Sequence, residues 1–138
     1  MVEFKLLDKN NIDQIWPILS SMVAEVLKYT HGEETELSVK NALLNDEIYI
    51  MLLYNDNMIE GFFTINPCGN ILYIPHTYIN KRKPREYLNL MNNKIEEIGK
   101  IFSCKSIRAY SNRAGMKRRL KNLGWKSGYV EYIKEINV

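Results

Sequence analysis

The hydrophobic pattern of the N-terminal part of the chain predicts a strand followed by two helices. Residues 2–7, VEFKLL, alternate well enough between apolar and polar side chains for a strand. From Asn11 onward the apolar residues recur close to the helical period, and Asn11 with Gln14 predicts a capping box at the helix start. Pro17 is a potential kink in this helix, and residues 35–45, TELSVKNALLN, predict a shorter second helix. The apolar positions of the first helix are Ile12, Ile15, Trp16, Leu19, Val23 and Val26.

The middle of the chain predicts an antiparallel meander. Residues 48–79 hold three β-rich runs, which are divided by the turn compositions NDN and NPCGN. Pro75 lies inside the third run and cannot donate a hydrogen bond to a neighbouring strand, so we expect the ladder to break there, at an edge, a bulge or a splay. We therefore predict that the third strand parts from the later strand 106–110 and does not pair with it along its whole length.

The C-terminal half predicts alternating helices and strands. Pro84 suits the first turn of a long helix, where its missing N–H removes no hydrogen bond. Residues 106–110 predict a short strand, residues 112–125 a helix that ends at Gly124, and residues 128–136 a closing strand. The predicted fold class is α/β (α+β), with a mixed, mainly antiparallel sheet and helices on both faces. The apolar face of the long helix consists of Tyr87, Leu88, Met91, Ile95, Ile98 and Phe102.

Length and composition narrow the class of protein. The chain has 138 residues, of which 46% are apolar and 25% charged, so we expect residues 1–138 to form one globular domain. No apolar run approaches the roughly 18 residues that span a bilayer, and the start MVEFKLLDKN lacks the layout of a secretory signal, so we expect a cytoplasmic protein. Cys68 and Cys104 lie far apart, which predicts two unpaired thiols and no metal site.

A basic elbow precedes the long helix. Its cations lead into a helix N-terminus, where free backbone donors and the helix dipole favour an anion. Arginine can hold a phosphate group through two parallel hydrogen bonds, so the elbow is a candidate phosphate site. A solvated basic turn is the alternative. The elbow cations are Lys81, Arg82, Lys83 and Arg85.

A second basic cluster occupies the predicted last helix. Because the net charge is only +3, attraction to a polyanion depends on where the cations lie. A basic run is usually a solvated helix face, and the alternative is a surface that binds nucleic acid or an acidic partner. If the clusters 81–85 and 113–121 share one surface, the basic patch is considerable. The second cluster consists of Arg113, Lys117, Arg118, Arg119 and Lys121, with Lys105, Arg108 and Lys126 close in sequence.

The order of elements and two local motifs resemble the GCN5-related N-acetyltransferase (GNAT) superfamily. The last helix of that fold typically begins with Asn and ends in Leu-Gly-Phe, and the segment SNRAGMKRRLKNLGW of this chain is similar. The stretch HTYI, residues 76–79, followed by the basic elbow is similar to short members of the superfamily that phages often encode. In layout, the resemblance covers nearly the whole chain.

The resemblance implies acetyl-CoA, or another acyl-CoA, as co-substrate. It would bind where strands 71–79 and 106–110 part, with backbone N–H groups of the first strand and of the elbow on the pantetheine and the pyrophosphate. Asn112 matches the Asn that touches the pantetheine arm in the superfamily, and its plain structural role would be a helix cap. The cofactor-binding residues expected from the resemblance are Ile74, Thr77, Tyr78, Ile79, Lys81, Arg82, Lys83, Arg85 and Asn112.

The chain departs from the superfamily pattern at two places. The usual elbow contains spaced small residues, chiefly glycine, but this chain has no glycine between Asn70 and Gly99. Many acetyltransferases also place a Tyr four residues before the helix-ending Gly, where it can protonate the leaving thiolate, and here that position is Leu120. Tyr110, at the end of strand 106–110, is the candidate substitute.

Two residues are candidates for the catalytic base. Acetylation of an amine requires removal of a proton from the nitrogen, and histidine is a residue type that suits this task, which makes His76 the first candidate. Bases of the superfamily are often Glu on the central strands, which makes Glu60 the second candidate. A lone His in a strand is more often structural, and that alternative stays open. The predicted catalytic residues are His76, Glu60 and Tyr110.

The sequence favours an acyl-CoA-dependent N-acyltransferase that acts by direct attack of an amine on the thioester. The acceptor amine is not defined by any motif. The alternative is a catalytically degenerate GNAT-fold protein, phage-encoded, that binds nucleic acid or another partner through its basic face or serves a structural role. The expected assembly is a monomer or a homodimer without membrane contact.

Overall fold

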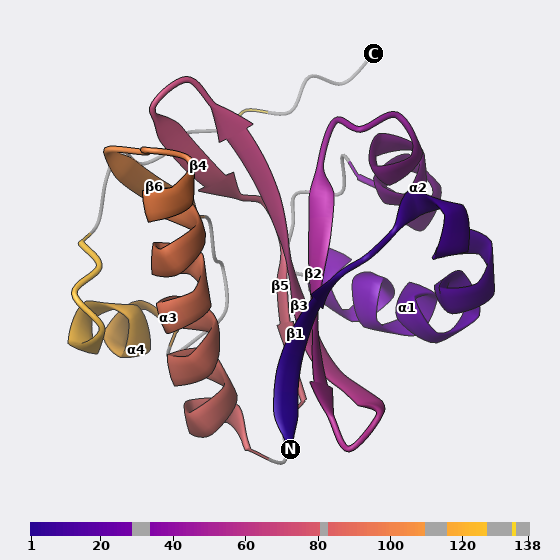
Figure 1. The fold of residues 1–138 in the computed structure, drawn as a ribbon, viewed down its shortest axis with the longest axis horizontal. Coiled ribbons are helices and arrows are strands. Elements are labelled where there is room, and N and C mark those ends of the chain that lie inside the picture. Colours follow the sequence, from indigo (N-terminus) through magenta and orange to yellow (C-terminus); the bar gives the residue numbers. More distant parts are fainter. Residues whose placement is uncertain (29–33, 81–82, 110–115, 127–133, 135–138) are drawn as a thin grey trace.

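The computed structural model describes residues 1–28, 34–80, 83–109, 116–126 and 134, and Figure 1 shows their arrangement. The predicted order of elements is present up to the last helix, whereas the closing strand predicted at 128–136 lies outside the described residues except for residue 134. The elements are β1 (Val2–Leu6), the short 3-10 turn η1 (Lys9–Asn11), α1 (Ile12–Leu27), α2 (Glu36–Leu44), β2 (Tyr49–Asn55), β3 (Met58–Cys68), β4 (Ile71–Ile74), β5 (Thr77–Ile79), α3 (Pro84–Ile101), β6 (Ser106–Ala109) and α4 (Met116–Asn122).

Strand β3 lies at the centre of a mixed sheet. The strand order is β1-β2-β3-β4-β6, and β5 pairs with β3. The pairing of β4 with β6 is parallel, and the other pairings in the described sheet are antiparallel. Helices α1 and α2 cover one face of the sheet, and α3 and α4 lie on the other side (Figure 1). The predicted fold class is therefore confirmed.

The first two helices begin in different ways. Helix α1 begins after Asn11 as predicted, but the predicted capping box is wrong because the Asn11 side chain makes no capping hydrogen bond. The 3-10 turn η1 leads directly into α1, and it is the Asp8 side chain that accepts a hydrogen bond, from the Asn10 N–H, at 3.0 Å. Helix α2 has a complete capping box, in which the Thr35 and Ser38 side chains each accept from the other residue's N–H.

Helix α3 begins at Pro84 as predicted and packs its apolar face on the sheet. Phe102 was expected on that face, but it is 51% exposed because α3 ends at Ile101 and Phe102 caps it. Ser103 then adopts a positive φ of 55°, which turns the chain toward β6. Within the described part of the chain, no helix is long and apolar enough to cross a membrane.

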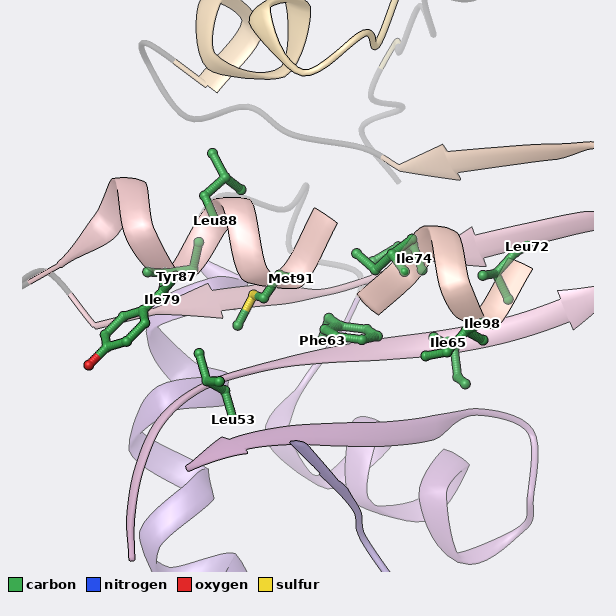
Figure 2. Packing of buried hydrophobic residues seen from close by; sticks show 11 residues of the cluster. Leu53, Phe63, Ile65, Leu72, Ile74, Ile79, Tyr87, Leu88, Met91 and Ile98 are labelled. Carbon is green, nitrogen blue, oxygen red and sulfur yellow. The ribbon is translucent and has the colours of Figure 1, made fainter. Parts of the chain in front are cut away.

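Two hydrophobic clusters hold the layers together, one on each face of the sheet. Figure 2 shows the cluster between the sheet and α3, in which Phe63 and Leu53 face Met91 and Tyr87. The opposite cluster joins α1 and α2 to the sheet and includes Phe62. Because adjacent β3 residues contribute to opposite clusters, the sheet is buried on both faces along its centre.

Gly61 allows a close contact among β3, β5 and α3. A Cβ atom at this position would lie 2.6 Å from the Tyr78 carbonyl oxygen and 2.7 Å from Met91 Cε. We expect Gly61→Ala to lower the free energy of unfolding by about 1–3 kcal/mol, because these atoms must shift to admit the methyl group. Denaturant unfolding monitored by circular dichroism measures the change.

Gly99→Ala is the matched control within α3. A Cβ atom there would meet nothing closer than Ile107 at 3.5 Å, and alanine favours a helix interior. The free energy of unfolding should stay the same or rise by up to about 1 kcal/mol. An equal loss in both variants would contradict a specific packing role for Gly61.

Candidate functional site

The strand that follows β3 contains one extra residue at Pro75. In β4, Tyr73 pairs with Asn66, whereas in β5 Thr77 pairs with Phe63. The two β3 residues 64 and 65 therefore face the three residues 74–76, which is the arrangement of a β-bulge. The predicted break of the ladder at Pro75 is confirmed, and we call residues 74–76 the Pro75 bulge.

Strands β5 and β6 part at the Pro75 bulge. The parallel ladder of β4 and β6 reaches Ile74 and Ala109, and beyond it β5 pairs with β3 alone among the described strands. The predicted parting is therefore confirmed. Hydrogen bonds from the Thr64 N–H to the His76 carbonyl and from the Asn80 N–H to the Glu60 carbonyl show that even-numbered residues of this strand bond to β3.

This pattern determines where the remaining backbone donors of β5 point. In an antiparallel pair, every second residue directs its N–H and C=O groups away from the partner strand. The N–H groups of Thr77 and Ile79 therefore point away from β3, to the side on which the ladder with β6 has ended. Within the described part of the chain, β6 does not pair with these two N–H groups, which makes them candidate donors to a ligand.

His76 lies within the bulge and is held at both ring nitrogens. The His76 residue is 5% exposed, its Nδ1 atom lies 2.8 Å from Thr64 Oγ1, and its Nε2 atom lies 2.8 Å from Glu34 Oε2. The His76 backbone N–H also donates to Thr64 Oγ1, at 2.9 Å. This hydroxyl replaces the β3 carbonyl that a regular ladder would offer, so Thr64 stabilises the bulge directly.

The hydrogen-bonding partners define the neutral tautomer of His76. An ionised carboxylate can only accept hydrogen bonds, so Nε2 carries the hydrogen that is donated to Glu34. Nδ1 then accepts the Thr64 hydroxyl hydrogen, while Thr64 Oγ1 accepts the His76 N–H. Neither ring nitrogen remains available to a substrate in this arrangement. The assignment of His76 as the catalytic base stays a prediction, and its observed contacts position Glu34.

Glu60 occupies a second irregularity, in β3. The register between β2 and β3 shifts at this point, so Glu60 is an extra residue on β3. Glu60 is 2% exposed, and its Oε2 atom accepts a hydrogen bond of 2.6 Å from Asn80 Nδ2. This pair fixes the end of β5 immediately before the basic elbow. The role of Glu60 as second candidate base stays a prediction.

Three cross-strand pairs between β3 and the strand that contains β5 lie on the face of the sheet that α1 covers, and two of these pairs are polar. The rings of Phe62 and Tyr78 stack between the polar pairs, with centroids 5.9 Å apart and an interplanar angle of 20°. Both rings belong to the cluster beneath α1 and α2, so this face carries polar groups on either side of an aromatic centre. Its three cross-strand pairs are Thr64 with His76, Phe62 with Tyr78, and Glu60 with Asn80.

The described part of the basic elbow is exposed. Lys83 is the N-cap residue of α3 but provides no side-chain cap, and its ammonium group lies 3.8 Å from Glu86. The Arg85 side chain is exposed and forms no ion pair with another described residue. Lys81 and Arg82 lie outside the described residues. The elbow therefore presents the charges of Lys83 and Arg85 at the N-terminus of α3, a few residues after the end of β5.

The remaining predicted site residues are only partly placed. Ile74 is 2% exposed, so its contribution to a ligand would come from its backbone. Tyr110 and Asn112 lie outside the described residues. Trp125, three residues after the end of α4, donates a hydrogen bond of 2.8 Å from Nε1 to Oδ1 of Asn92 in α3. Among the described residues, no group of three His, Cys, Asp or Glu side chains could hold a metal ion.

Three residues of the site were not predicted from the sequence. Glu34 reaches His76 from the segment before α2, and its partner is 42 positions away in the chain. Thr64 and Asn80 acquire their roles only through the register that the bulge imposes. The alternation of β3 could have placed Thr64 on the same face as Phe62, but it gave no sign of the His76 contact.

Structural comparison finds the same fold in solved structures of acetyltransferases. The fold is similar to a ribosomal-protein-alanine N-acetyltransferase from Brucella melitensis biovar Abortus 2308, with a TM-score of 0.74, 12% identity, and coverage of 99% of this chain and 100% of that chain. A predicted acetyltransferase from Clostridium acetobutylicum, solved with acetyl-CoA, gives 0.67 at 15% identity, covering 99% and 96%. AAC(6')-Iy, solved with the bisubstrate analogue CoA-S-monomethyl-acetylneamine, gives 0.70 at 11% identity, covering 99% of each chain.

No protein-family model matches the sequence, and no curated protein matches it. The structural likeness over the full chain defines the class by fold, and the chain has the fold of the GCN5-related N-acetyltransferase superfamily. The resemblance inferred from the sequence is thereby confirmed at the level of the fold. The likeness to phage-encoded members stays a prediction.

Removal of the Thr64 hydroxyl tests how much the hydrogen-bond network of the Pro75 bulge contributes to stability. Thr64→Val keeps the shape of the side chain but leaves the His76 N–H and Nδ1 without their partner. A buried polar group without a partner costs about 1–3 kcal/mol, so we expect the free energy of unfolding to fall by about 2–4 kcal/mol. Thr77→Val is the control, because the Thr77 hydroxyl makes no hydrogen bond among the described residues, and its effect should stay within about 0.5 kcal/mol. Equal losses would show that the network does not stabilise the bulge.

Proposed function

We propose that this protein is an acyl-CoA-dependent N-acyltransferase that transfers an acetyl group from acetyl-CoA to an amine. The observation that carries the proposal is the parting of β5 from β6 at the Pro75 bulge. It directs the N–H groups of Thr77 and Ile79 toward a ligand in place of a neighbouring strand. A fold shared with structures that contain CoA or acetyl-CoA supports the same co-substrate.

The chemistry requires few groups from the protein. The amine nitrogen attacks the thioester carbonyl carbon, a C–N bond forms, the C–S bond breaks, and the CoA thiolate leaves. The amine loses one proton, and the thiolate gains one. Backbone N–H groups of β5 would hold the acyl-pantetheine arm in the orientation that this attack needs. Tyr110 is the proposed donor to the thiolate.

The basic elbow supplies the charge that the phosphate groups of CoA require. Lys83 and Arg85 stand at the start of α3, where the helix dipole also favours an anion. Arginine forks can hold phosphate even where the glycine-rich backbone of the superfamily is missing. We therefore propose that side chains of the elbow replace part of the usual backbone cradle.

Comparison of acetyl-CoA with acetyl-pantetheine tests this division of roles. Acetyl-pantetheine lacks the phosphates, so it should bind through β5 alone. At 100 times its dissociation constant, acetyl-CoA should raise the free energy of unfolding by about 2.7 kcal/mol. We expect Arg85→Ala to weaken acetyl-CoA by about threefold to thirtyfold, the loss of one charge-assisted contact. The same variant should leave the affinity for acetyl-pantetheine unchanged in a calorimetric titration.

Lys100→Ala is the matched control, since Lys100 is exposed at the opposite end of α3. It should leave both affinities unchanged. Absence of any acetyl-CoA binding by the native chain would contradict the transferase proposal. Equal weakening by both substitutions would contradict a local phosphate site at the elbow.

A second candidate function is the binding of nucleic acid through the exposed cations of α4. Arg118, Arg119 and Lys121 are all exposed, and none of them forms an ion pair with another described residue. If they contact phosphates, the variant Arg118→Ala/Arg119→Ala should weaken binding to a generic DNA duplex and reduce the salt slope by about two. An unchanged salt slope would show that these cations do not contact phosphates and that this helix face is only a solvated surface.

A further inference from the structure

The charged residues that the structure describes are divided unequally between the two helical layers. Between residues 12 and 48, which include α1 and α2, the described residues comprise six Asp or Glu and two Lys. In residues 83–109 and 116–126, which include α3 and α4, there are 11 Lys or Arg and three Glu. These layers lie on opposite sides of the sheet (Figure 1). An anionic ligand is therefore favoured on one side and a cationic ligand on the other.

Glu34 belongs to the acidic layer and lies beside the Pro75 bulge. Its Oε2 atom is held by His76 Nε2 at 2.8 Å, and His76 is held in turn by Thr64, which is 0% exposed. The Glu34 side chain is itself 44% exposed. A carboxylate with one oxygen fixed to a buried imidazole and the remainder open to solvent has a defined orientation at an accessible position.

In the proposed function the acceptor amine has to reach the thioester beside β5, and Glu34 contacts His76, the residue that directly precedes β5. The bulge that contains His76 also begins β5, whose N–H groups are directed toward the acyl-pantetheine arm in the proposed function. Most amines are ammonium ions at neutral pH, and a carboxylate accepts charge-assisted hydrogen bonds from such a cation. Neither nitrogen of His76 remains available for this contact.

We propose that Glu34 binds the ammonium group of the acceptor, that His76 positions Glu34, and that the acceptor is a small polycationic amine. This inference rests on the proposed transferase function and assigns its acceptor subsite. The excess of carboxylates around α1 and α2 favours several positive charges over a single one. It also disfavours a nucleic acid as acceptor, because phosphates would be repelled from this layer.

Spermidine is the probe that tests the subsite. In a calorimetric titration of the full chain, Glu34→Gln should weaken spermidine binding at least tenfold, because the amide still accepts from His76 Nε2 but carries no charge. The affinity for acetyl-CoA should stay within twofold of the native value. In acetyl transfer, KM for spermidine should rise at least tenfold while kcat changes less than threefold.

Glu36→Gln is the matched control for general electrostatics. Glu36 is exposed in the first turn of α2, two positions after Glu34, and lies outside the His76 network. Its spermidine affinity should stay within threefold of the native value. If the native chain does not bind spermidine, if Glu34→Gln binds as the native chain does, or if both variants weaken equally, the inference is overturned.

The variant His76→Asn tests whether His76 acts by positioning Glu34 or by contacting the acceptor itself. Asparagine is too short to reach Glu34, so this variant should lose spermidine affinity as Glu34→Gln does, and the double variant should lose no more. Independent, additive losses would overturn the positioning role. Because His76 is buried, its variant must first show a native circular dichroism spectrum. If it does not, Glu34→Gln with its control Glu36→Gln decides the inference.

The test distinguishes the subsite from the transferase proposal. If acetyl-CoA produces no stabilisation and no acetyl transfer, but spermidine binds in a Glu34-dependent way, the transferase proposal fails and the cation site stands. If acetyl-CoA binds and spermidine does not, the transferase proposal stands and the cation site fails.

Discussion

The site depends on one extra residue in the strand that follows β3. Because Pro75 and His76 insert a bulge, β4 remains paired with β6 while β5 does not continue that pairing. A regular strand would have satisfied its N–H groups on both sides and left none for a ligand. The bulge lacks a regular ladder hydrogen bond at the His76 N–H, and Thr64 replaces it locally, because its hydroxyl bonds both this backbone N–H and the His76 ring.

Much of the fold could be predicted from periodicity and a few special residues. The apolar stripe of α3, the proline at its first position and the turn compositions of the meander reflect local rules, and these elements formed where they were expected. Pro75 also predicted the break correctly, since the absence of an N–H is a property of the residue itself. The capping box at Asn11 failed because a 3-10 turn, which periodicity does not reveal, precedes the helix.

The contacts of the site could be predicted much less well. His76 was recognised from its chemistry, but its partners come from β3 and from the segment before α2, and only the three-dimensional register brings them together. Glu34 is one of several carboxylates in this part of the sequence, and no local pattern distinguishes it as the partner of His76. Glu60 was recognised as a polar residue on a central strand, whereas its bond to Asn80 depends on the register of β5.

The position of His76 also has a thermodynamic consequence for any two ligands of this protein. His76 is part of the Pro75 bulge, which directly precedes the N–H donors of β5, and its ring holds the Glu34 carboxylate in the segment before α2. A ligand that shifts the backbone of this strand must change the free energy of orienting Glu34, and a ligand on Glu34 must change that of the strand by the same amount. Linkage therefore makes the two affinities reciprocal, so that each ligand alters the dissociation constant of the other by one common factor.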